Sequence, residues 1–321
     1  MKDSLKNTTW IAVRKSNIKY YESVELYYRN PAGNIVLYKP EGMMLDDESL
    51  NKKYVDSYFI KPEDKIKCLR AAQKGFSEQL AHNIVTQNTV TVKNELVNIV
   101  DETLSQPRSG GLEIVPELMN NLIAGYSSQP DVIKNLARIS FTDYTTTIHS
   151  VNVMALTMGY CFYTGRSLEE TKQFGLAALL HDLGKTEIPG EILTANRSLT
   201  DSEFTDMKRH PRLGYKILQG TNIDLKIAVE GSLEHHEKLD GSGYPEGKTN
   251  ISECGMVLGI IDCYEAITND DRPYRSAMSP LAALELIKKD SENGKYNNEI
   301  FKDFAYSLTD FNHTGKKSGI F

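Results

Sequence analysis

The chain of 321 residues is 40% hydrophobic and 25% charged, which is ordinary for a soluble globular protein with one large or two modest domains. Its formal net charge of −6 argues against DNA or RNA polymers and anionic membrane surfaces as partners, but it is compatible with a local basic pocket for one small phosphorylated molecule. The four cysteines form no CxxC pair, which favours reduced thiols over a disulfide framework. The apolar stretches are too short to span a membrane and the N-terminus lacks the apolar core of a signal peptide, so we expect a cytoplasmic protein with no membrane span.

Residues 10 to 60 have the pattern of a small β-rich module. Short runs rich in Tyr, Val and Ile predict two strands joined by a turn at residues 30–34, and the segment 55–61 predicts a third strand. The tyrosines of these runs are interpreted as sheet-packing residues rather than as a binding platform. Asp46 and Asp47 are interpreted as helix-capping acids rather than as metal ligands.

From Pro62 onward the pattern becomes helical. Pro62 and the acids after it are typical of a helix start, and helical periodicity continues to about Leu104. The segment 105–111 is typical of a linker. We therefore predict a mostly α fold, with a small mixed α/β N-terminal domain and its connecting helix in residues 1–104 and an α-helical domain in residues 112–321. Within the latter, helices are expected near 112–126, 131–144, 147–163, 168–181, 201–219, 224–236, 252–269, 280–291 and 298–309.

Histidines are concentrated in the helical part of the chain. Five of the seven lie between His149 and His236, each at or near the end of an apolar helix, and His181 is followed directly by Asp182. Helix ends that meet in a bundle can aim imidazoles and carboxylates at one pocket. Neutral imidazoles with carboxylates suit Fe, Mn, Zn or Co, and the lack of cysteine ligands disfavours a closed structural zinc site. A single histidine here is better explained as an ordinary structural residue, but the set with Asp182 predicts a metal centre.

Five motifs occur in order between about residues 131 and 279: HSVNV, HDLGKTEIP, LTDSEFTDMKRHPRLGYKIL, HHEKLDGSGYPEG and IIDCYEAITNDDRPYRSAMSP. In this order and spacing they resemble the HD-GYP domain, the bacterial cyclic-di-GMP phosphodiesterase group of the HD metallohydrolase superfamily. The resemblance implies a helical-bundle HD-type metallohydrolase fold. Residues 18–80 resemble, more weakly, a small strand-rich module that often precedes such domains, and a regulatory or dimerising role for it is a hypothesis.

The resemblance also implies a set of metal ligands, namely His149, His181, Asp182, His210, His235, His236 and Asp262. A carboxylate such as Asp182 can bridge two cations, which suits a two-metal phosphoryl-transfer site. Iron or manganese is the metal that the family favours. Members with a third metal carry a glutamate one helical turn before the first histidine, where this chain has Thr145. We therefore expect two divalent transition metals and no organic cofactor.

The implied activity is hydrolysis of cyclic-di-GMP to the linear dinucleotide pGpG by a metal-bridging hydroxide, with further cleavage to GMP left open. Asp182 and Lys185 are the expected catalytic residues. The expected substrate-binding residues are Lys185, Gly243, Tyr244, Pro245, Arg272 and Arg275. Ordinary alternatives are a solvated lysine, a simple turn at the glycines, and arginines paired with Asp270 and Asp271.

Three departures from the family pattern affect the substrate pocket more than the metal ligands. The segment between Asp262 and Arg272 is one residue longer than usual, Glu265 replaces a frequent aspartate, and TANRSLT stands where a lysine-proline-glycine loop is common. Two alternatives therefore stay open: a low-turnover cyclic-di-GMP receptor, and a phosphodiesterase for another cyclic dinucleotide. A diguanylate cyclase partner, or self-association, is a further hypothesis.

Overall fold

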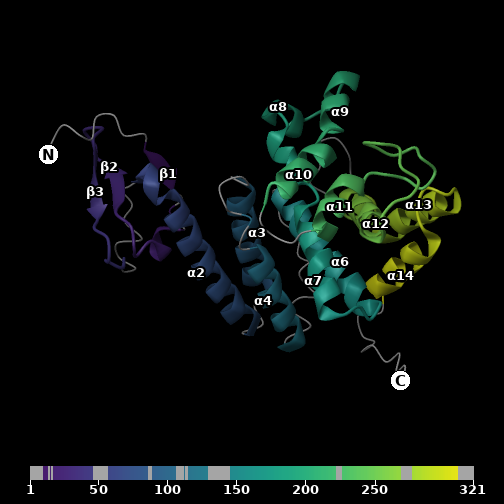
Figure 1. The fold of residues 1–321 in the computed structure, drawn as a ribbon, viewed down its shortest axis with the longest axis horizontal. Helices are drawn as coiled ribbons and strands as arrows, with labels where there is room; N and C mark the ends of the chain where they lie inside the picture. Colours follow the sequence, from purple (N-terminus) through teal and green to yellow (C-terminus); the bar gives the residue numbers. More distant parts are fainter. Residues whose placement is uncertain are drawn as a thin grey trace.

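The computed structural model describes the following residues: 10–13, 15, 17–45, 57–85, 89–105, 112, 115–128, 145–221, 226–268 and 277–309. Within them the molecule is mostly α-helical with one small sheet, which confirms the predicted fold class. Figure 1 shows the sheet at one end of the molecule, the long helices α2, α3 and α4 in the middle, and the remaining helices gathered at the other end. Asp46 and Asp47 lie outside the described residues, as does the predicted helix at 131–144.

The sheet has four strands, β1 (Ile11–Val13), β2 (Leu26–Arg29), β3 (Ile35–Lys39) and β4 (Tyr58–Ile60), in the order β1-β4-β2-β3. All three neighbouring pairs are antiparallel. The predicted turn at 30–34 joins β2 to β3, with Gly33 at a positive φ of 83° and the Asn34 N–H donating to the Asn30 side chain over 2.9 Å. The predicted third strand is β4, and the edge strand β1 adds to the three that the sequence pattern indicated.

A short 3-10 turn, η1 (Ile18–Tyr20), lies between β1 and β2, and a second, η2 (Pro62–Asp64), connects β4 to the helices that follow. The helical run expected from Pro62 to Leu104 is two helices, α2 (Lys65–Val85) and α3 (Thr89–Ser105), which pack against each other. Helix α4 (Val115–Ser128) follows and packs on α2. Most of the predicted linker at 105–111 lies outside the described residues, so the division at that point stays a prediction.

The C-terminal helices are α6 (Thr146–Tyr163), α7 (Leu168–Leu180), η6 (Leu183–Glu187), α8 (Gly190–Leu193), α9 (Asp201–Met207), α10 (His210–Gln219), α11 (Lys226–Glu234), α12 (Glu253–Thr268), α13 (Pro280–Glu292) and α14 (Asn298–Thr309). Helix α12 packs against α6 and α11, while α3 and α4 pack against α6 and α7 respectively. Buried apolar side chains form one continuous core from Leu26 in the sheet to Phe304 in α14. None of the described helices is long and apolar enough to cross a bilayer.

Capping side chains explain where several of these helices begin. Ser167 and Thr200 form capping boxes with Glu170 and Glu203 at the starts of α7 and α9. The hydroxyl of Thr145 accepts a hydrogen bond from the Ile148 N–H at the start of α6. Each of these signals is local in the sequence, which is why the predicted starts near 147, 168 and 201 agree with the structure.

The prediction of one helix over 201–219 is wrong. The chain breaks at residues 208–209, and α10 begins at His210 with a proline in its first turn. Pro211 lacks an N–H and disfavours helical backbone at the residue before it, so an uninterrupted helix through this point would lose a backbone hydrogen bond. The break matters because it places His210 at a helix start rather than inside a helix.

Candidate metal centre

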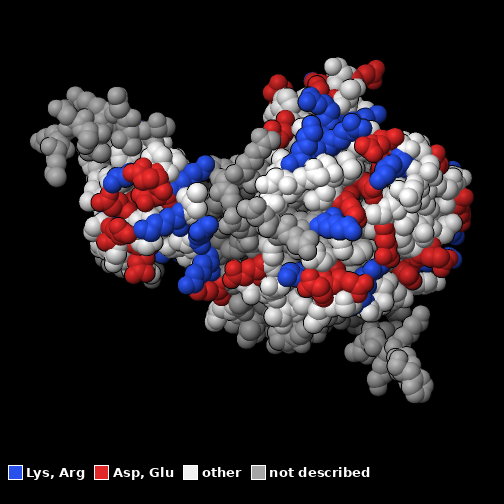
Figure 2. Space-filling view, viewed as in Figure 1, with Lys and Arg blue, Asp and Glu red and all other residues white. Residues whose placement is uncertain are grey.

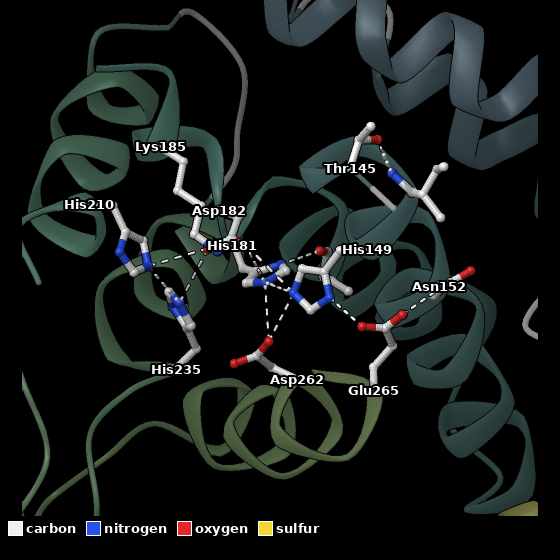
Figure 3. A network of polar contacts seen from close by, with 12 residues as sticks. Thr145, His149, Asn152, His181, Asp182, Lys185, His210, His235, Asp262 and Glu265 are labelled. Carbon is white, nitrogen blue, oxygen red and sulfur yellow. Dashed lines mark hydrogen bonds and ion pairs between the residues drawn. The ribbon is translucent and has the colours of Figure 1, made fainter. Parts of the chain in front are cut away.

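The imidazoles and carboxylates singled out in the sequence converge at one place inside the helical half. His149 comes from α6, His210 from the start of α10 and Asp262 from α12, while the remaining members follow the ends of α7 and α11 directly. Figure 3 shows the side chains of His149, His181, Asp182, His210, His235 and Asp262 pointing toward one another. All are buried except His236, which is partly exposed. The structure therefore brings together His149, His181, Asp182, His210, His235, His236 and Asp262.

The ligand atoms fall into two groups, one of His149, His181 and Asp182 and one of His210, His235 and His236. Within each group the candidate ligand atoms lie within 4.8 Å of one another. This separation into two clusters is the arrangement that a pair of cations requires.

Asp182 lies between the two groups and faces both. Its Oδ2 is 3.6 Å from His149 Nε2 and 3.5 Å from His181 Nε2. Its Oδ1 is 3.3 Å from His210 Nε2 and 3.9 Å from His235 Nε2. One carboxylate thus offers one oxygen to each group, as a bridging ligand must.

Asp262 completes the first group and reaches toward the second. Its Oδ1 is 2.9 Å from His149 Nε2, and its Oδ2 is 3.9 Å from His236 Nδ1. Burial opposes the charged form of this carboxyl, but the imidazoles of His149, His236 and His181 hold its pKa well below its usual range. Asp262 is therefore an anion available to a cation.

Backbone carbonyls orient three of the imidazoles. The Nδ1 atoms of His181, His210 and His235 lie 2.7, 2.8 and 3.0 Å from the carbonyl oxygens of Ala178, Met207 and Ser232. Because a carbonyl only accepts, each Nδ1 carries the proton of its hydrogen bond, and each Nε2 keeps a lone pair directed into the site. This arrangement is typical of histidines that ligate metals.

His149 is oriented by a carboxylate instead. Its Nδ1 donates to Glu265 Oε2 over 2.5 Å, and the other oxygen of Glu265 accepts a hydrogen bond from Asn152 Nδ2 over 2.7 Å. Burial lowers the pKa of His149, but the carboxylates of Glu265 and Asp262 outweigh it and raise the pKa to about 9. A cation at this position therefore competes with a proton. The sequence pattern marked Glu265 only as an unusual replacement and gave no signal for its partner Asn152.

The donor set fits divalent transition metals. Asp182 Oδ1 is buried and has no hydrogen-bond partner among the described residues. A buried carboxylate oxygen without a partner is costly, and a bound cation would remove that cost. Burial also lowers the pKa of His181, His235 and His236, which keeps these imidazoles in the neutral form that binds metals.

Lys185 lies in η6, one turn beyond the His181–Asp182 pair. Its ammonium forms an ion pair with Asp182 Oδ2, and its side chain is 23% exposed, so it reaches both the carboxylate and the surface. Burial opposes ionisation of Asp182, but the charge of Lys185 and the imidazoles of His181 and His210 hold the pKa of Asp182 well below its usual range.

Gly184 sets how closely η6 approaches α10. A side-chain carbon at this position would lie 1.9 Å from the His210 carbonyl oxygen and 2.4 Å from the Gly214 nitrogen. Only glycine allows this contact, which fixes His210 against the His181–Asp182 segment. The sequence reasoning missed Gly184 because only its place after a His-Asp pair distinguished it.

The loop DGSGYP folds back on the chain beside the second group. Gly241 has a positive φ of 79°, and a side-chain carbon on Gly243 would lie 2.4 Å from the Lys238 nitrogen, so both glycines serve the packing of the loop. The Tyr244 ring stacks on His236 with centroids 4.6 Å apart. The Pro245 carbonyl oxygen lies 3.4 Å from an Arg212 guanidinium nitrogen that donates to it.

The remaining predicted substrate residues, Arg272 and Arg275, lie outside the described residues, as do Asp270 and Asp271. Thr145, which stands where a third-metal ligand occurs in some proteins, is used as the cap of α6.

Comparisons with known proteins show which proteins this chain resembles. The HD domain family model matches residues 119–300. The chain is 34% identical over 195 residues to cyclic di-GMP phosphodiesterase PA4108 of Pseudomonas aeruginosa, covering 60% of this chain and 46% of that protein. It is 40% identical over 123 residues to cyclic di-GMP phosphodiesterase response regulator RpfG of Xanthomonas campestris pv. campestris, covering 37% and 32%. It is also 32% identical over 155 residues to 3'3'-cGAMP-specific phosphodiesterase 1 of Vibrio cholerae, covering 48% and 36%.

A solved structure extends the likeness to nearly the whole chain. Bd1817 of Bdellovibrio bacteriovorus, described as a HDG"Y"P protein, superposes with a TM-score of 0.64 at 18% identity and covers 94% of this chain and 99% of its own. This likeness shows the fold, whereas the matches to the curated relatives span about half of their length or less. The match of the HD domain model to more than half of the chain, over the segment that carries the histidine motifs, places the protein in the HD domain family.

Proposed function

We propose that the protein is a metal-dependent phosphodiesterase that hydrolyses cyclic-di-GMP to linear pGpG at a centre of two divalent metals. The observation that carries this proposal is the position of Asp182, whose two oxygens face two separate groups of imidazoles. The names of the cyclic-di-GMP phosphodiesterase relatives support the choice of substrate. Following the family resemblance, we further propose iron or manganese as the metal. The scattered cysteines without a CxxC pair support the cytoplasm as the proposed location.

The metals, when bound, would supply Lewis acidity toward the scissile phosphate and lower the pKa of a nucleophilic water. The protein's own side chains would hold the metals and contact the substrate. His149, His181, His210, His235, His236 and Asp262 would hold the pair, and Asp182 would fix the separation between them. Lys185 is the described cation beside Asp182, so its ammonium would donate to the phosphate or to the departing 3′ oxygen.

The surface beside the centre suits an anionic substrate despite the negative charge of the whole chain. Figure 2 shows basic side chains gathered over α9 and α10, a stretch that contributes Lys208, Arg209, Arg212 and Lys216. The Arg209 and Arg212 side chains pair with Asp206 and Glu246. Lys208 instead lies against two rings, 4.5 Å from the Phe204 centroid and 5.6 Å from the Tyr244 centroid, and has no carboxylate partner among the described residues.

This placement makes the Tyr244 side of the centre the proposed entry for the dinucleotide. Tyr244 would stack on a guanine, with Gly243 and Pro245 fixing the loop that carries it. Arg272 and Arg275 are proposed to bind phosphate on the grounds of the family resemblance alone.

The decisive experiment is a substrate panel on the purified chain, loaded anaerobically with Fe(II), Mn(II) or Zn(II). Cyclic-di-GMP and 3′3′-cGAMP are each incubated with the protein, and the products are separated by chromatography. We expect about two metals per chain and conversion of cyclic-di-GMP to pGpG. A fully loaded protein that converts neither dinucleotide would contradict the proposal, and tight binding in calorimetry without product would indicate a receptor instead.

A second candidate substrate is 3′3′-cGAMP, because relatives specific for it occur among the matches. The two substrates differ in one purine base, so the contacts of a base with Tyr244, the proposed stacking ring, would contribute to the choice between them. A higher kcat/KM for 3′3′-cGAMP in the same panel would favour this second candidate.

A further inference from the structure

The motif HHEKLDGSGYPEG contains a buried carboxylate that the proposed function leaves without a role. Glu237 directly follows His235 and His236 and is 3% exposed, yet it belongs to neither group of candidate metal ligands among the described residues. Both of its oxygens are occupied by the chain itself. Oε1 accepts a hydrogen bond from the Glu246 N–H over 2.7 Å, and Oε2 accepts one from the Lys248 N–H over 3.0 Å. This carboxylate therefore holds a loop rather than a cation.

The loop held in this way, residues 238–248, carries Tyr244. The Tyr244 N–H donates to the His236 carbonyl oxygen over 3.2 Å, so the loop returns to the residue that precedes Glu237. A side-chain carbon on Gly243 would lie 2.5 Å from the Glu237 Cα, so the two stretches of backbone are in direct contact. This return places the Tyr244 ring nearly parallel to the His236 imidazole, with an angle of 29° between their planes.

Tyr244 lies between the two points at which the loop is attached. Its own N–H binds the His236 carbonyl, and the N–H of Glu246, two residues further on, binds Glu237. Hydrogen bonds to a buried charged group are worth more than neutral ones. Ser242, Glu246 and Gly247 are exposed, so this part of the loop has few packing contacts of its own. Without the bonds to Glu237, the ring of Tyr244 would lose its fixed place on His236.

We propose that Glu237 is a positioning residue for the substrate, which acts through the loop to hold the Tyr244 ring where a purine base of the dinucleotide stacks on it. The inference rests on the proposed function, in which Tyr244 contacts a base. It separates two roles within one motif, because His235 and His236 hold metal while Glu237 fixes the substrate side of the centre. Loss of Glu237 therefore weakens dinucleotide binding and leaves the metal content unchanged.

The kinetics of a Glu237→Gln variant test this role. Glutamine has nearly the same size, but its amide nitrogen is a donor and cannot accept the second backbone N–H. Removing an aromatic ring on which a base stacks typically weakens binding about tenfold or more. We therefore expect KM for the dinucleotide that the protein cleaves to rise about tenfold. The kcat should change less than about twofold, because stacking holds the ground state and the transition state alike, and elemental analysis should find the wild-type metal content.

Glu234→Gln is the matched control. Glu234 lies three residues earlier and is 5% exposed, and its carboxylate accepts the Ser252 N–H over 2.7 Å and pairs with the Lys248 ammonium. These contacts hold the part of the chain next to α12, so the variant should lower the melting temperature by a similar amount while KM stays within about twofold. An equal rise of KM in both variants would overturn the proposal, as would the loss of a metal from Glu237→Gln.

A double variant tests whether Glu237 acts through Tyr244. Tyr244→Ala should raise KM at least as much as Glu237→Gln does, and adding Glu237→Gln to it should change KM no further. Losses that multiply in the double variant would contradict the proposed route. If Glu237→Gln does not fold, Glu237→Asp takes its place, because its shorter side chain keeps the charge but does not reach both N–H groups. An unchanged KM in that folded variant would overturn the proposal.

A readout without nucleotide separates this inference from the proposed function. Amide hydrogen exchange of the metal-loaded protein should be about tenfold faster at Glu246 and Lys248 in Glu237→Gln than in the wild type, and unchanged in α6. If the wild type cleaves neither dinucleotide, the proposed function fails on that result alone. The exchange rates still decide whether Glu237 fixes the loop, and unchanged rates would overturn its positioning role.

Discussion

Two regions of the molecule bury charged groups in opposite ways. In the N-terminal sheet, Lys39 is 1% exposed, and its ammonium donates to the carbonyl oxygens of Glu22, Val24 and Pro40 over 3.1, 2.8 and 3.1 Å. In the helical half, Asp182 is equally buried, yet its Oδ1 accepts no hydrogen bond among the described residues while four imidazoles face the carboxylate.

The difference separates a structural charge from a functional one. All three protons of Lys39 are used by the chain itself, so this lysine completes the fold and has nothing left to offer a ligand. Asp182 and the Nε2 atoms of His181, His210 and His235 keep lone pairs directed at one another, which is unfavourable in a protein interior unless a cation lies between them. The partnerless Oδ1 among imidazoles therefore distinguishes Asp182 from the structural Lys39.

The largest expected effect comes from Asp182→Ala, which removes the carboxylate whose two oxygens face imidazoles of both groups. Metal content, measured by elemental analysis, should fall from about two per chain to one or none, and turnover should fall by more than about a hundredfold, beyond what orienting groups contribute. Asp206→Ala, at a partly exposed aspartate of α9, is the matched control and should keep normal metal content and normal turnover. Normal metal content in the Asp182→Ala protein would contradict the functional role assigned to Asp182, as opposed to the structural role of Lys39.

A smaller effect, on stability rather than on metal content, is expected for Lys39→Met. Three buried carbonyl oxygens would lose their donor, so the free energy of unfolding should fall by about 1–3 kcal/mol, measured by urea denaturation. Metal content should not change, because the residue lies in the sheet. Lys67→Met, an exposed lysine paired with Glu41, should alter stability far less. A loss of metal from Lys39→Met would show that the N-terminal sheet contributes to metal binding and not only to stability.

The smallest effect concerns a charge at the surface. Hydrogen bonds from Arg197 and from Thr200 lower the pKa of Glu203 to about 2 from an ordinary value of 4.5. Since the folded pKa is the lower one, ionised Glu203 stabilises the protein fully above about pH 4.5, and this contribution disappears as the pH falls to about 2. The difference in melting temperature between the wild type and Glu203→Gln should therefore be small and constant near neutral pH, and should shrink in acid. A difference that grows on acidification would contradict this assignment.

The sequence allowed the residues of the centre to be named before their positions were known. His149 and Asp262 were assigned from motifs that are far apart in the chain, and the structure places them 2.9 Å from each other. Helix starts were also predictable, because a cap such as Thr145 or Ser167 acts on residues three positions away. The helix break before His210 was missed, although Pro211 gave a local signal for it.

What the sequence indicated by itself was the set of candidate ligands, through the family resemblance of its motifs, and the class of fold, because capping and apolar periodicity are properties of short stretches of chain. The tertiary structure alone decided which oxygen of Asp182 faces which group, which nitrogen of His181, His210 and His235 contacts a backbone carbonyl, and that Glu265, 116 positions away, orients His149. These relations depend on how α6 and α12 pack, and packing is set by the fit of whole helix surfaces rather than by any local pattern.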